Sequence, residues 1–240
     1  MEADFNYHGD VVVFDLDDTL MLERDYCRSG FRLIAGMLAA RHGAQWLGIS
    51  KRLDTILRRR GAYFDFLETQ LAREAGLSDA ALRSEMQQLV DAYRSHVPKR
   101  LNLRPGVREM LDELRRRRVV MAMITDGRSV TQRAKLKALG IEEYFHPANI
   151  LISQETSADK STPANFECIV RRYPEARRFH YVADNVAKDF LMPSLMGWQT
   201  WRVPPHHDEV HTAIQPADTF QQPQNEMHAF SDIFVAVKGG

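Results

Sequence analysis

The chain has 240 residues, of which 44% are hydrophobic and 27% charged, so it is long enough to bury a core. Lysine plus arginine and aspartate plus glutamate each count 32, so the formal net charge is zero. This balance argues against a nucleic-acid or membrane-surface partner, since either usually requires a basic excess. Two cysteines are too few for a disulfide framework, and no stretch approaches the ~18 apolar residues of a membrane span. Because the first residues also lack a signal-peptide pattern, we expect a soluble, cytoplasmic protein.

Short apolar runs recur along the chain and alternate with helical patterns. The runs lack polar alternation, which is typical of strands buried on both faces of a parallel sheet. Strands that alternate with helices predict an α/β fold with a doubly wound, mostly parallel, Rossmann-like sheet. The five predicted strands cover residues 11–14, 119–124, 150–152, 179–183 and 198–203.

One connection is much longer than the dozen or so residues that a crossover between parallel strands needs. About a hundred residues separate the first predicted strand from the second. Apolar residues repeat there at helical spacing in three stretches, near residues 31–38, 64–71 and 82–93. We therefore expect residues 23–97 to form an inserted, all-helical cap domain. The Rossmann-like core would then comprise residues 1–22 and 98–240.

Three helices are predicted within the core. Residues 107–114 and 134–139 carry apolar side chains at helical spacing, and Gly140 suits the end of the second helix. Thr162 suits the N-cap and Pro163 the first position of a third helix.

The pattern becomes polar after residue 203. Only residues 217–220 and 230–237 are expected to be ordered pieces of this tail. Its three histidines could suggest a metal site, but they lack nearby carboxylate or cysteine ligands at a typical spacing, so we do not expect one. They are His206, His207 and His211.

Four polar residues fall at or just beyond the carboxyl end of a predicted strand, namely Asp15, Asp17, Thr125 and Asp184. In an open α/β sheet this edge is where ligands bind. With Asp18 and Asp189, up to five carboxylates would gather there, and each pair ~4 Å apart would repel by about 4 kcal/mol. A cation must balance them, and oxygen-only ligands at a small site favour Mg²⁺. The alternative is that aspartates at strand ends only form turns, which is the role expected of Asp18.

Four strings resemble the motifs of the haloacid dehalogenase-like hydrolase superfamily, and they occur in the family's order. They are Asp-Leu-Asp-Asp-Thr at 15–19, Ile-Thr-Asp-Gly at 124–127, Lys-Ser-Thr-Pro-Ala-Asn-Phe at 160–166 and Ala-Asp-Asn-Val-Ala-Lys-Asp at 183–189. Ser161 stands where the family often has proline, and Ala183 where it has glycine; both are supporting positions. A helical cap inserted after the first strand is also a feature of the family, so the resemblance covers everything except the tail.

The resemblance implies a magnesium-dependent phosphatase that works through an aspartyl-phosphate intermediate. Asp15 would be the nucleophile. Asp17 would be the general acid that protonates the leaving oxygen and then the base that activates water. The ion would be held by the Asp15 carboxylate, the Asp17 backbone carbonyl and Asp184.

The same resemblance implies how the phosphoryl group is bound. Thr125 would donate a hydrogen bond to it, together with the backbone amides of Asp126 and Gly127. Lys160 would neutralise both the nucleophile and the phosphoryl group. Asp189 would orient Lys160 or a metal-bound water.

Basic residues of the cap have two interpretations. Arg24, Arg28 and Arg32 are spaced by four, so they share one helical stripe. Arg24 and Arg28, close to the first motif, could bind an anionic substrate, whereas a solvated helix face is the alternative. The same choice applies to Arg128, and Lys188 is expected to be a surface residue.

Other activities remain open on the sequence. A phosphomutase keeps the same pair of aspartates, and a non-catalytic phosphate-binding regulator could keep the fold. A haloacid dehalogenase is disfavoured, because it has no leaving alkoxide and thus no need of Asp17. A small phosphorylated metabolite, such as a phosphosugar or nucleotide, fits a capped crevice better than a phosphoprotein does. The sequence does not indicate which one, nor the oligomeric state.

Overall fold

The computed structural model describes residues 6–59, 61–210 and 218–240. Within them, a six-stranded sheet runs in the order β3-β2-β1-β4-β5-β6, and every neighbouring pair is parallel. The predicted α/β fold with a doubly wound parallel sheet is therefore confirmed. The strands are β1 (Asp10–Phe14), β2 (Val120–Thr125), β3 (Ile150–Ile152), β4 (Arg178–Ala183), β5 (Gln199–Arg202) and β6 (Asn225–Glu226).

The position of β1 at the centre of the sheet determines where the site forms. Val13 lies opposite Ala122 of β2 on one side and Tyr181 of β4 on the other. With this register, the three strands end at the same edge of the sheet. The residues that follow β1 and β4 and the last residue of β2 are thus brought together.

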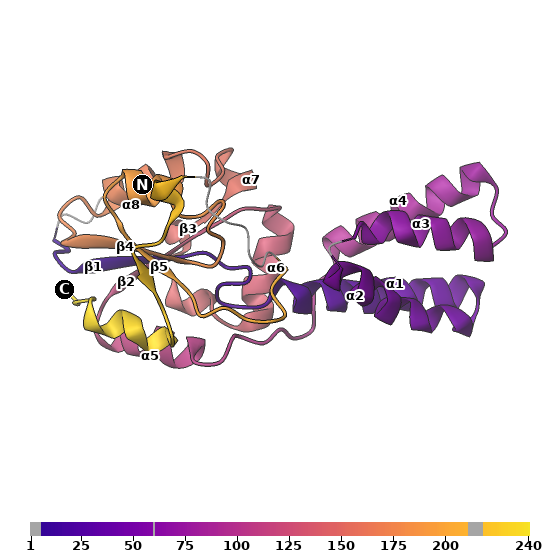
Figure 1. Cartoon of the computed structure of the whole chain (residues 1–240), viewed down its shortest axis with the longest axis horizontal. Helices are drawn as coiled ribbons and strands as arrows, with labels where there is room; N and C mark the ends of the chain where they lie inside the picture. The colour runs from indigo at the N-terminus through magenta and orange to yellow at the C-terminus, as the bar shows by residue number, and fades with distance from the viewer. Residues whose placement is uncertain (1–5, 60, 211–217) are drawn as a thin grey trace.

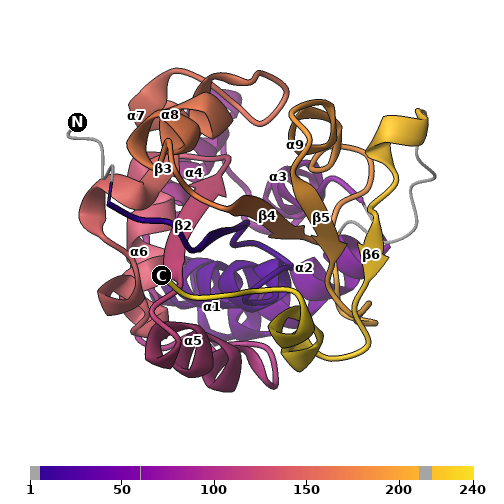
Figure 2. The same ribbon diagram turned by 90° about the vertical axis from the view of Figure 1, so that its left-hand side faces the viewer.

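Helices cover both faces of the sheet because successive strand residues point to opposite sides. Val12 and Phe14 join a core cluster that includes α5 (Val107–Arg116) and α6 (Ser129–Leu139), whereas Val11 and Val13 join a second cluster with α8 (Ala164–Arg172). Figure 2 shows these helices on either side of the sheet. Two short helices, α7 (Ser153–Thr156) and α9 (Leu191–Leu195), complete the core.

The inserted segment forms a helical lobe at the far end of the molecule from β1 (Figure 1). Its helices have an apolar cluster of their own, which contains the buried residues of all three predicted stripes. The boundaries of the cap domain stay a prediction. The helices are α1 (Glu23–His42), α2 (Ile49–Arg58), α3 (Tyr63–Glu74) and α4 (Asp79–Ser95), with a 3-10 helix at Ala44–Gly48.

Two local predictions are wrong. The helix expected to begin at Pro163 begins at Ala164, and the Thr162 hydroxyl donates to the Asp159 carbonyl rather than capping the helix. The tail is more ordered than its polar composition suggested. The two ordered pieces predicted there are found as 3-10 helices at Thr219–Gln221 and Phe230–Val235, but a sixth strand between them was not predicted.

The tail also completes the core. Phe230, Ile233 and Val237 are buried in the same cluster as the α5 side chains. The backbone of Lys238 accepts a hydrogen bond from the Asp10 amide, at the start of the central strand. No helix in the described ranges is both long and apolar enough to cross a membrane.

Candidate active site

A pocket of about 130 Å³ lies at the carboxyl edge of the sheet. All four polar residues expected at the strand ends line it, namely Asp15, Asp17, Thr125 and Asp184. Its other six lining residues are all polar or charged, which suits an ionic ligand rather than an apolar one. They are Glu23, Asp126, Lys160, Asn185, Lys188 and Asp189.

The turn after β1 is built around Asp18. Its φ of 51° lies in the left-handed region that aspartate adopts more readily than most residues. One carboxylate oxygen accepts the Glu23 amide at 2.9 Å, at the first turn of α1, and the other accepts the Val210 amide at 2.7 Å. Asp18 is thus the turn-forming aspartate that the sequence predicted, and it ties the start of the cap to the core.

The Lys160 ammonium bridges two carboxylates in the pocket. Its Nζ lies 2.9 Å from Asp15 Oδ1 and 2.6 Å from Asp189 Oδ1, so Asp189 is in contact with one of the two partners predicted for it. Burial raises the pKa of Asp15 to about 7, although Lys160 opposes this shift. The two carboxylates in turn hold the pKa of Lys160 well above its ordinary value despite its burial.

Asp15, Asp184 and Asp189 form a buried acidic cluster suited to a metal ion. Each offers a carboxylate oxygen, and these oxygens lie within 4.8 Å of one another. The Thr19 hydroxyl is within hydrogen-bond distance of two of them, at 3.0 Å from Asp184 Oδ1 and 3.3 Å from Asp15 Oδ2. Burial, then repulsion from Asp189 and Asp15, raises the pKa of Asp184 well above its usual range. Lys160 is a single positive charge beside these three carboxylates, so the donor set fits a further, hard cation.

Asp17 is held by a second lysine. Lys135 Nζ lies 2.7 Å from each Asp17 oxygen, and the Gln132 amide donates to Asp17 Oδ2 at 3.0 Å. The same Gln132 nitrogen donates to Thr125 Oγ1 at 2.6 Å. Two candidate catalytic residues from different strands are thus linked by one turn of α6.

The sequence profile of the haloacid dehalogenase-like hydrolases matches residues 10–197, which include both acidic motifs and the intervening cap helices. The chain belongs to this family. The predicted family membership and the prediction of a hydrolase are both confirmed.

Relatives of this hydrolase include two phosphatases. Glyceraldehyde 3-phosphate phosphatase of Methanopyrus kandleri is 27% identical over 177 residues, which cover 60% of this chain and 74% of that protein. Ribulose-1,5-bisphosphate 5-phosphatase of Halopiger xanaduensis is 30% identical over 131 residues, or 54% of this chain and 53% of that protein. The chain thus spans about half the length of the second relative.

Solved structures share the hydrolase fold. The Bacillus subtilis protein YfnB bound to magnesium has a TM-score of 0.62 at 18% identity, with coverage of 95% of this chain and 98% of that one. At this identity the likeness shows the fold alone.

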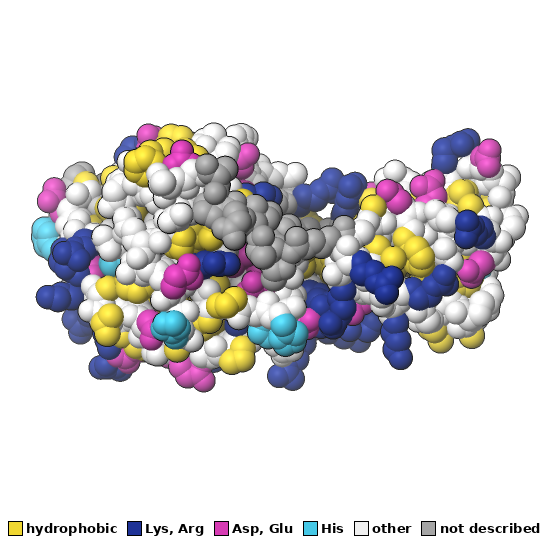
Figure 3. All heavy atoms as spheres, in the orientation of Figure 1, with side chains coloured by type: hydrophobic (Ala, Val, Ile, Leu, Met, Phe, Trp, Pro, Cys, Tyr) yellow, Lys and Arg dark blue, Asp and Glu magenta, His cyan; other side chains and the backbone are white. Residues whose placement is uncertain are grey.

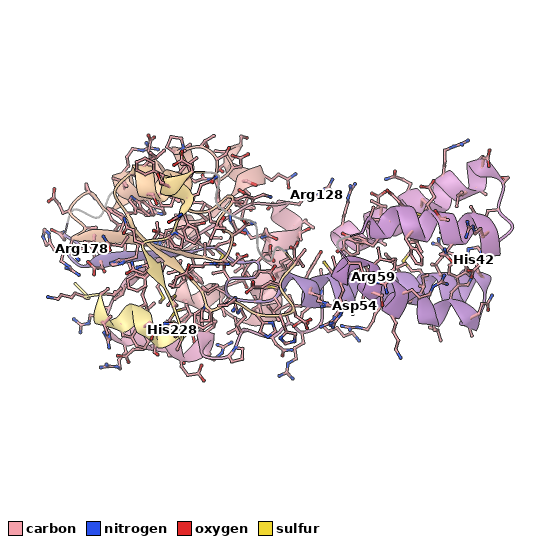
Figure 4. The ribbon with its side chains drawn as sticks, in the orientation of Figure 1. His42, Asp54, Arg59, Arg128, Arg178 and His228 are labelled. Carbon is pink, nitrogen blue, oxygen red and sulfur yellow. The ribbon has the colours of Figure 1, made fainter. Side chains whose placement is uncertain are left out.

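The hydrolase does not bring Arg24 and Arg28 to the pocket, contrary to one of the two interpretations. The other, a solvated helix face, does not describe Arg24 either, because Arg24 is 4% exposed. Arg24 Nε lies 2.9 Å from Asp54 Oδ1, and a second nitrogen of Arg24 lies 2.5 Å from Asp208 Oδ1. Arg28 contacts the same two aspartates, at 3.2 and 3.6 Å. Lysines and arginines gather where core and cap meet in Figure 3, and Figure 4 shows Asp54 on α2 in the half of the cap nearest the core. These carboxylates already neutralise both arginines.

Other expectations for single residues also need correction. The Gly127 amide donates to Ser153 Oγ at 2.9 Å, and Gly127 does not line the pocket, whereas Asp126 does. Arg128 lies outside the lining and is exposed, at the end of the core that faces the cap (Figure 4).

The histidines of the tail form no metal cluster among the described residues. His206 accepts a hydrogen bond from the Asp208 amide through Nδ1 and stacks on His207, with ring centroids 4.4 Å apart. His211 lies outside the described residues.

Several site residues escaped the sequence analysis. Glu23, the first residue of α1, lines the pocket from the cap side, and burial, then repulsion from Asp17, raises its pKa to about 7. Lys188 is exposed, as expected, yet it lies at the pocket. Gln132 and Lys135 lie three apart on α6, so they share a helix face, but their spacing does not show that this face meets the site.

Proposed function

We propose that the protein is a magnesium-dependent phosphomonoesterase that acts on a small phosphorylated metabolite through an aspartyl-phosphate. The observation that carries the proposal is the pair Asp15 and Asp17, each with its own lysine, at one small polar pocket. A nucleophile alone would serve a dehalogenase. A second carboxylate two residues on supplies the proton that an alkoxide leaving group requires.

Asp15 is the nucleophile of the proposed first step. Its carboxylate oxygen forms a bond to phosphorus as the bond to the leaving oxygen breaks, and Asp17 gives that oxygen a proton. In the second step Asp17 takes a proton from water, which attacks the phosphorus and releases Asp15 and inorganic phosphate. Splitting one displacement into two helps because phosphate monoesters are among the slowest substrates to hydrolyse unaided.

The remaining charges in the pocket would support this chemistry. Lys160 and the Thr125 hydroxyl, both buried, would contact the phosphoryl oxygens. Asp15 and Asp184 would hold Mg²⁺ together with the backbone carbonyl of Asp17. When bound, the ion would screen the nucleophile from the phosphoryl group and stabilise charge on its oxygens.

The substrate class rests on pocket size and on the relatives. A pocket of about 130 Å³ suits a phosphoryl group with a short polar chain. Both phosphatases reported above are named for small sugar phosphates. We therefore propose a phosphosugar of few carbons rather than a nucleotide.

The proposal is tested by release of inorganic phosphate from a panel of sugar phosphates, nucleotides and p-nitrophenyl phosphate. We expect turnover that requires Mg²⁺ and stops with EDTA. Asp15→Asn should lower kcat by at least ~10³-fold while the protein keeps its circular dichroism spectrum. Asp65→Asn, an exposed aspartate of α3, is the matched control and should behave as wild type.

Two outcomes would contradict the proposal. One is undiminished activity of Asp15→Asn. The other is no phosphate release from any ester by the wild type with Mg²⁺, as expected of a non-catalytic binder. If an isomerised sugar phosphate accumulates in place of free phosphate, the protein is instead a phosphomutase.

A further inference from the structure

We propose that Lys135 is a positioning residue that holds the Asp17 carboxylate in place for proton transfer, with Gln132 as its second support. The inference rests on the proposed function, because it concerns how Asp17 reaches the leaving oxygen. It adds to the proposed site two residues of α6 that lie outside the four family motifs.

The geometry of the contact is specific. Lys135 Nζ is equidistant from both Asp17 oxygens, at 2.7 Å, and Gln132 Nε2 contacts one of them at 3.0 Å. Both donors are buried, with exposures of 3% and 1%, whereas the Asp17 side chain remains 21% exposed. The supports are thus fixed in the core, and only the carboxylate they hold is open to the pocket.

The surroundings explain why Asp17 needs such a support. Repulsion from the Asp17 carboxylate helps to raise the pKa of both Asp15 and Glu23. The three carboxylates are therefore close enough to repel one another. The Lys135 ammonium offsets this repulsion, because it contacts both oxygens of Asp17. Proton transfer requires placement within hydrogen-bond reach, and a displacement of about 1 Å can cost about 10²-fold in rate.

Gln132 extends the support to a second catalytic residue. Its Nε2 lies between Asp17 Oδ2 and Thr125 Oγ1. The carboxylate that would protonate the leaving oxygen and the hydroxyl that would bind the phosphoryl group are therefore held at a set separation. A glutamine that served stability alone would not need to join these two groups, and the buried ion pair of Lys135 and Asp17 is in any case a weak stabiliser.

The cap closes over the same lysine. Lys135 Nζ lies 4.7 Å from the centre of the Tyr26 ring, which belongs to the first turn of α1 and is 4% exposed. An ammonium over an aromatic face is an attractive contact. The cap thus helps to keep Lys135, and through it Asp17, in one arrangement.

The test compares esters that differ in how much they need a proton. The full-length variant Lys135→Met, which keeps the volume of the buried stem, is assayed with Mg²⁺ on p-nitrophenyl phosphate, phenyl phosphate and glycerol 3-phosphate. kcat/KM is compared because it reports the step in which the leaving group departs. We expect a ~10²-fold loss for phenyl and glycerol phosphates but less than a ~10-fold loss for p-nitrophenyl phosphate, whose leaving group is the weakest base. Lys137→Met changes an exposed lysine of the same helix and should leave kcat/KM for all three esters unchanged.

A double-mutant cycle separates positioning from general damage. In the Asp17→Asn background, Lys135→Met should cost no more than ~3-fold further, because the residue it positions is gone. An equal loss on all three esters, no loss, or full additivity with Asp17→Asn would overturn the inference. If Lys135→Met does not fold, Lys135→Arg decides. It keeps the charge but not the geometry, and should lose ~10-fold on phenyl and glycerol phosphates but not on p-nitrophenyl phosphate; an unselective loss would again overturn the inference.

Failure of the inference differs from failure of the proposed function. If the wild type releases no phosphate from any ester, the proposed function is wrong. If the wild type is active and Lys135→Met preserves its preference among leaving groups, only the positioning role is wrong.

Discussion

Asp15 and Asp17 are separated by one residue, yet each contacts its own ammonium group. Lys160 reaches Asp15 from the loop after α7, and Lys135 reaches Asp17 from α6. Without the second lysine, the two carboxylates would repel each other and the rest of the acidic cluster. The same charges leave room for a divalent cation at Asp15 and Asp184, whose pKa values are both raised. At the proposed metal site, an ion and protons would therefore compete for these two residues.

This competition predicts the pH dependence of magnesium binding. The pKa of Asp15 is about 7 without metal, so this carboxyl must lose a proton to bind the ion between pH 5 and pH 7. We expect Mg²⁺ to bind about tenfold or more tightly at pH 8 than at pH 5.5, as measured by isothermal titration calorimetry. Binding that is independent of pH across this range would show that neither Asp15 nor Asp184 is a ligand.

The same shift affects the stability of the metal-free protein. The pKa of Asp15 is raised in the folded state, from 3.8 to about 7. Its stabilising contribution is therefore present below about pH 4 and is lost as the pH rises towards 7. Asn does not titrate, so the Tm of the wild type minus that of Asp15→Asn should fall between pH 5 and pH 8 in EDTA. A difference that rises with pH would contradict the assigned shift.

The Thr19 hydroxyl is an uncharged group that lies within hydrogen-bond distance of both Asp15 and Asp184. Thr19→Val keeps the shape of a fully buried side chain but removes its hydrogen bond to Asp184 or Asp15. We expect about 1 kcal/mol of lost stability and a weaker affinity for Mg²⁺, because the two carboxylates lose a common partner. Thermal melting with and without Mg²⁺ measures both. Thr55→Val, at an exposed site on α2, is the control, and an unchanged Mg²⁺ affinity of Thr19→Val would argue against the metal site at these carboxylates.

At the scale of elements, ion pairs join the cap to the core, in addition to the two segments of chain that connect them. Arg24 of α1 is nearly buried between Asp54 of α2 and Asp208 of the segment that follows β5. Arg58 of α2 also approaches Asp208, at 3.4 Å. One aspartate of the core thus contacts two helices of the cap.

Removing that aspartate should loosen the junction. In Asp208→Asn, the buried Arg24 keeps Asp54 but loses half of its compensation, so we expect a loss of about 1–2 kcal/mol rather than the 3–5 kcal/mol of a fully broken buried pair. For a chain of this size that is a fall in Tm of about 3–6 °C. Asp65→Asn is the exposed control, and a Tm equal to that of wild type in Asp208→Asn would show that the contact does not hold the cap.

The elements that the sequence predicted are those with the strongest physical signals. The strands were recognisable because runs such as Val11–Phe14 are apolar on both faces, and Gly140 does end α6 in the left-handed conformation. Helix α2 was missed because only Ile49, Leu53 and Leu57 are buried in it, among charged neighbours. The two-residue strand β6 carries no periodicity at all.

Part of the site could also be predicted from the sequence, and part could not. Asp15, Thr125 and Asp184 could be placed together because each ends a buried strand, and parallel strands end at one edge. Lys135 could not, because a lysine on an amphipathic helix is normally solvated, and only the three-dimensional path of α6 turns it towards Asp17. Arg24 and Arg28 were near the motif in sequence, but their partners come from α2 and from the distant Asp208.

For the molecule as a whole, the C-terminal tail is part of the core rather than an appendage. Ile233 is fully buried against the same cluster that includes β1 and α5, two residues before Val235, which is 90% exposed. Ile233→Ala should therefore cost about 2–5 kcal/mol through lost burial and a residual cavity, whereas Val235→Ala should cost less than about 0.5 kcal/mol. Urea unfolding measures both, and near-equal midpoints would mean that the tail does not share the core. Because β1 carries Asp15, we also expect Ile233→Ala to lose activity at the temperature at which it unfolds and not below it.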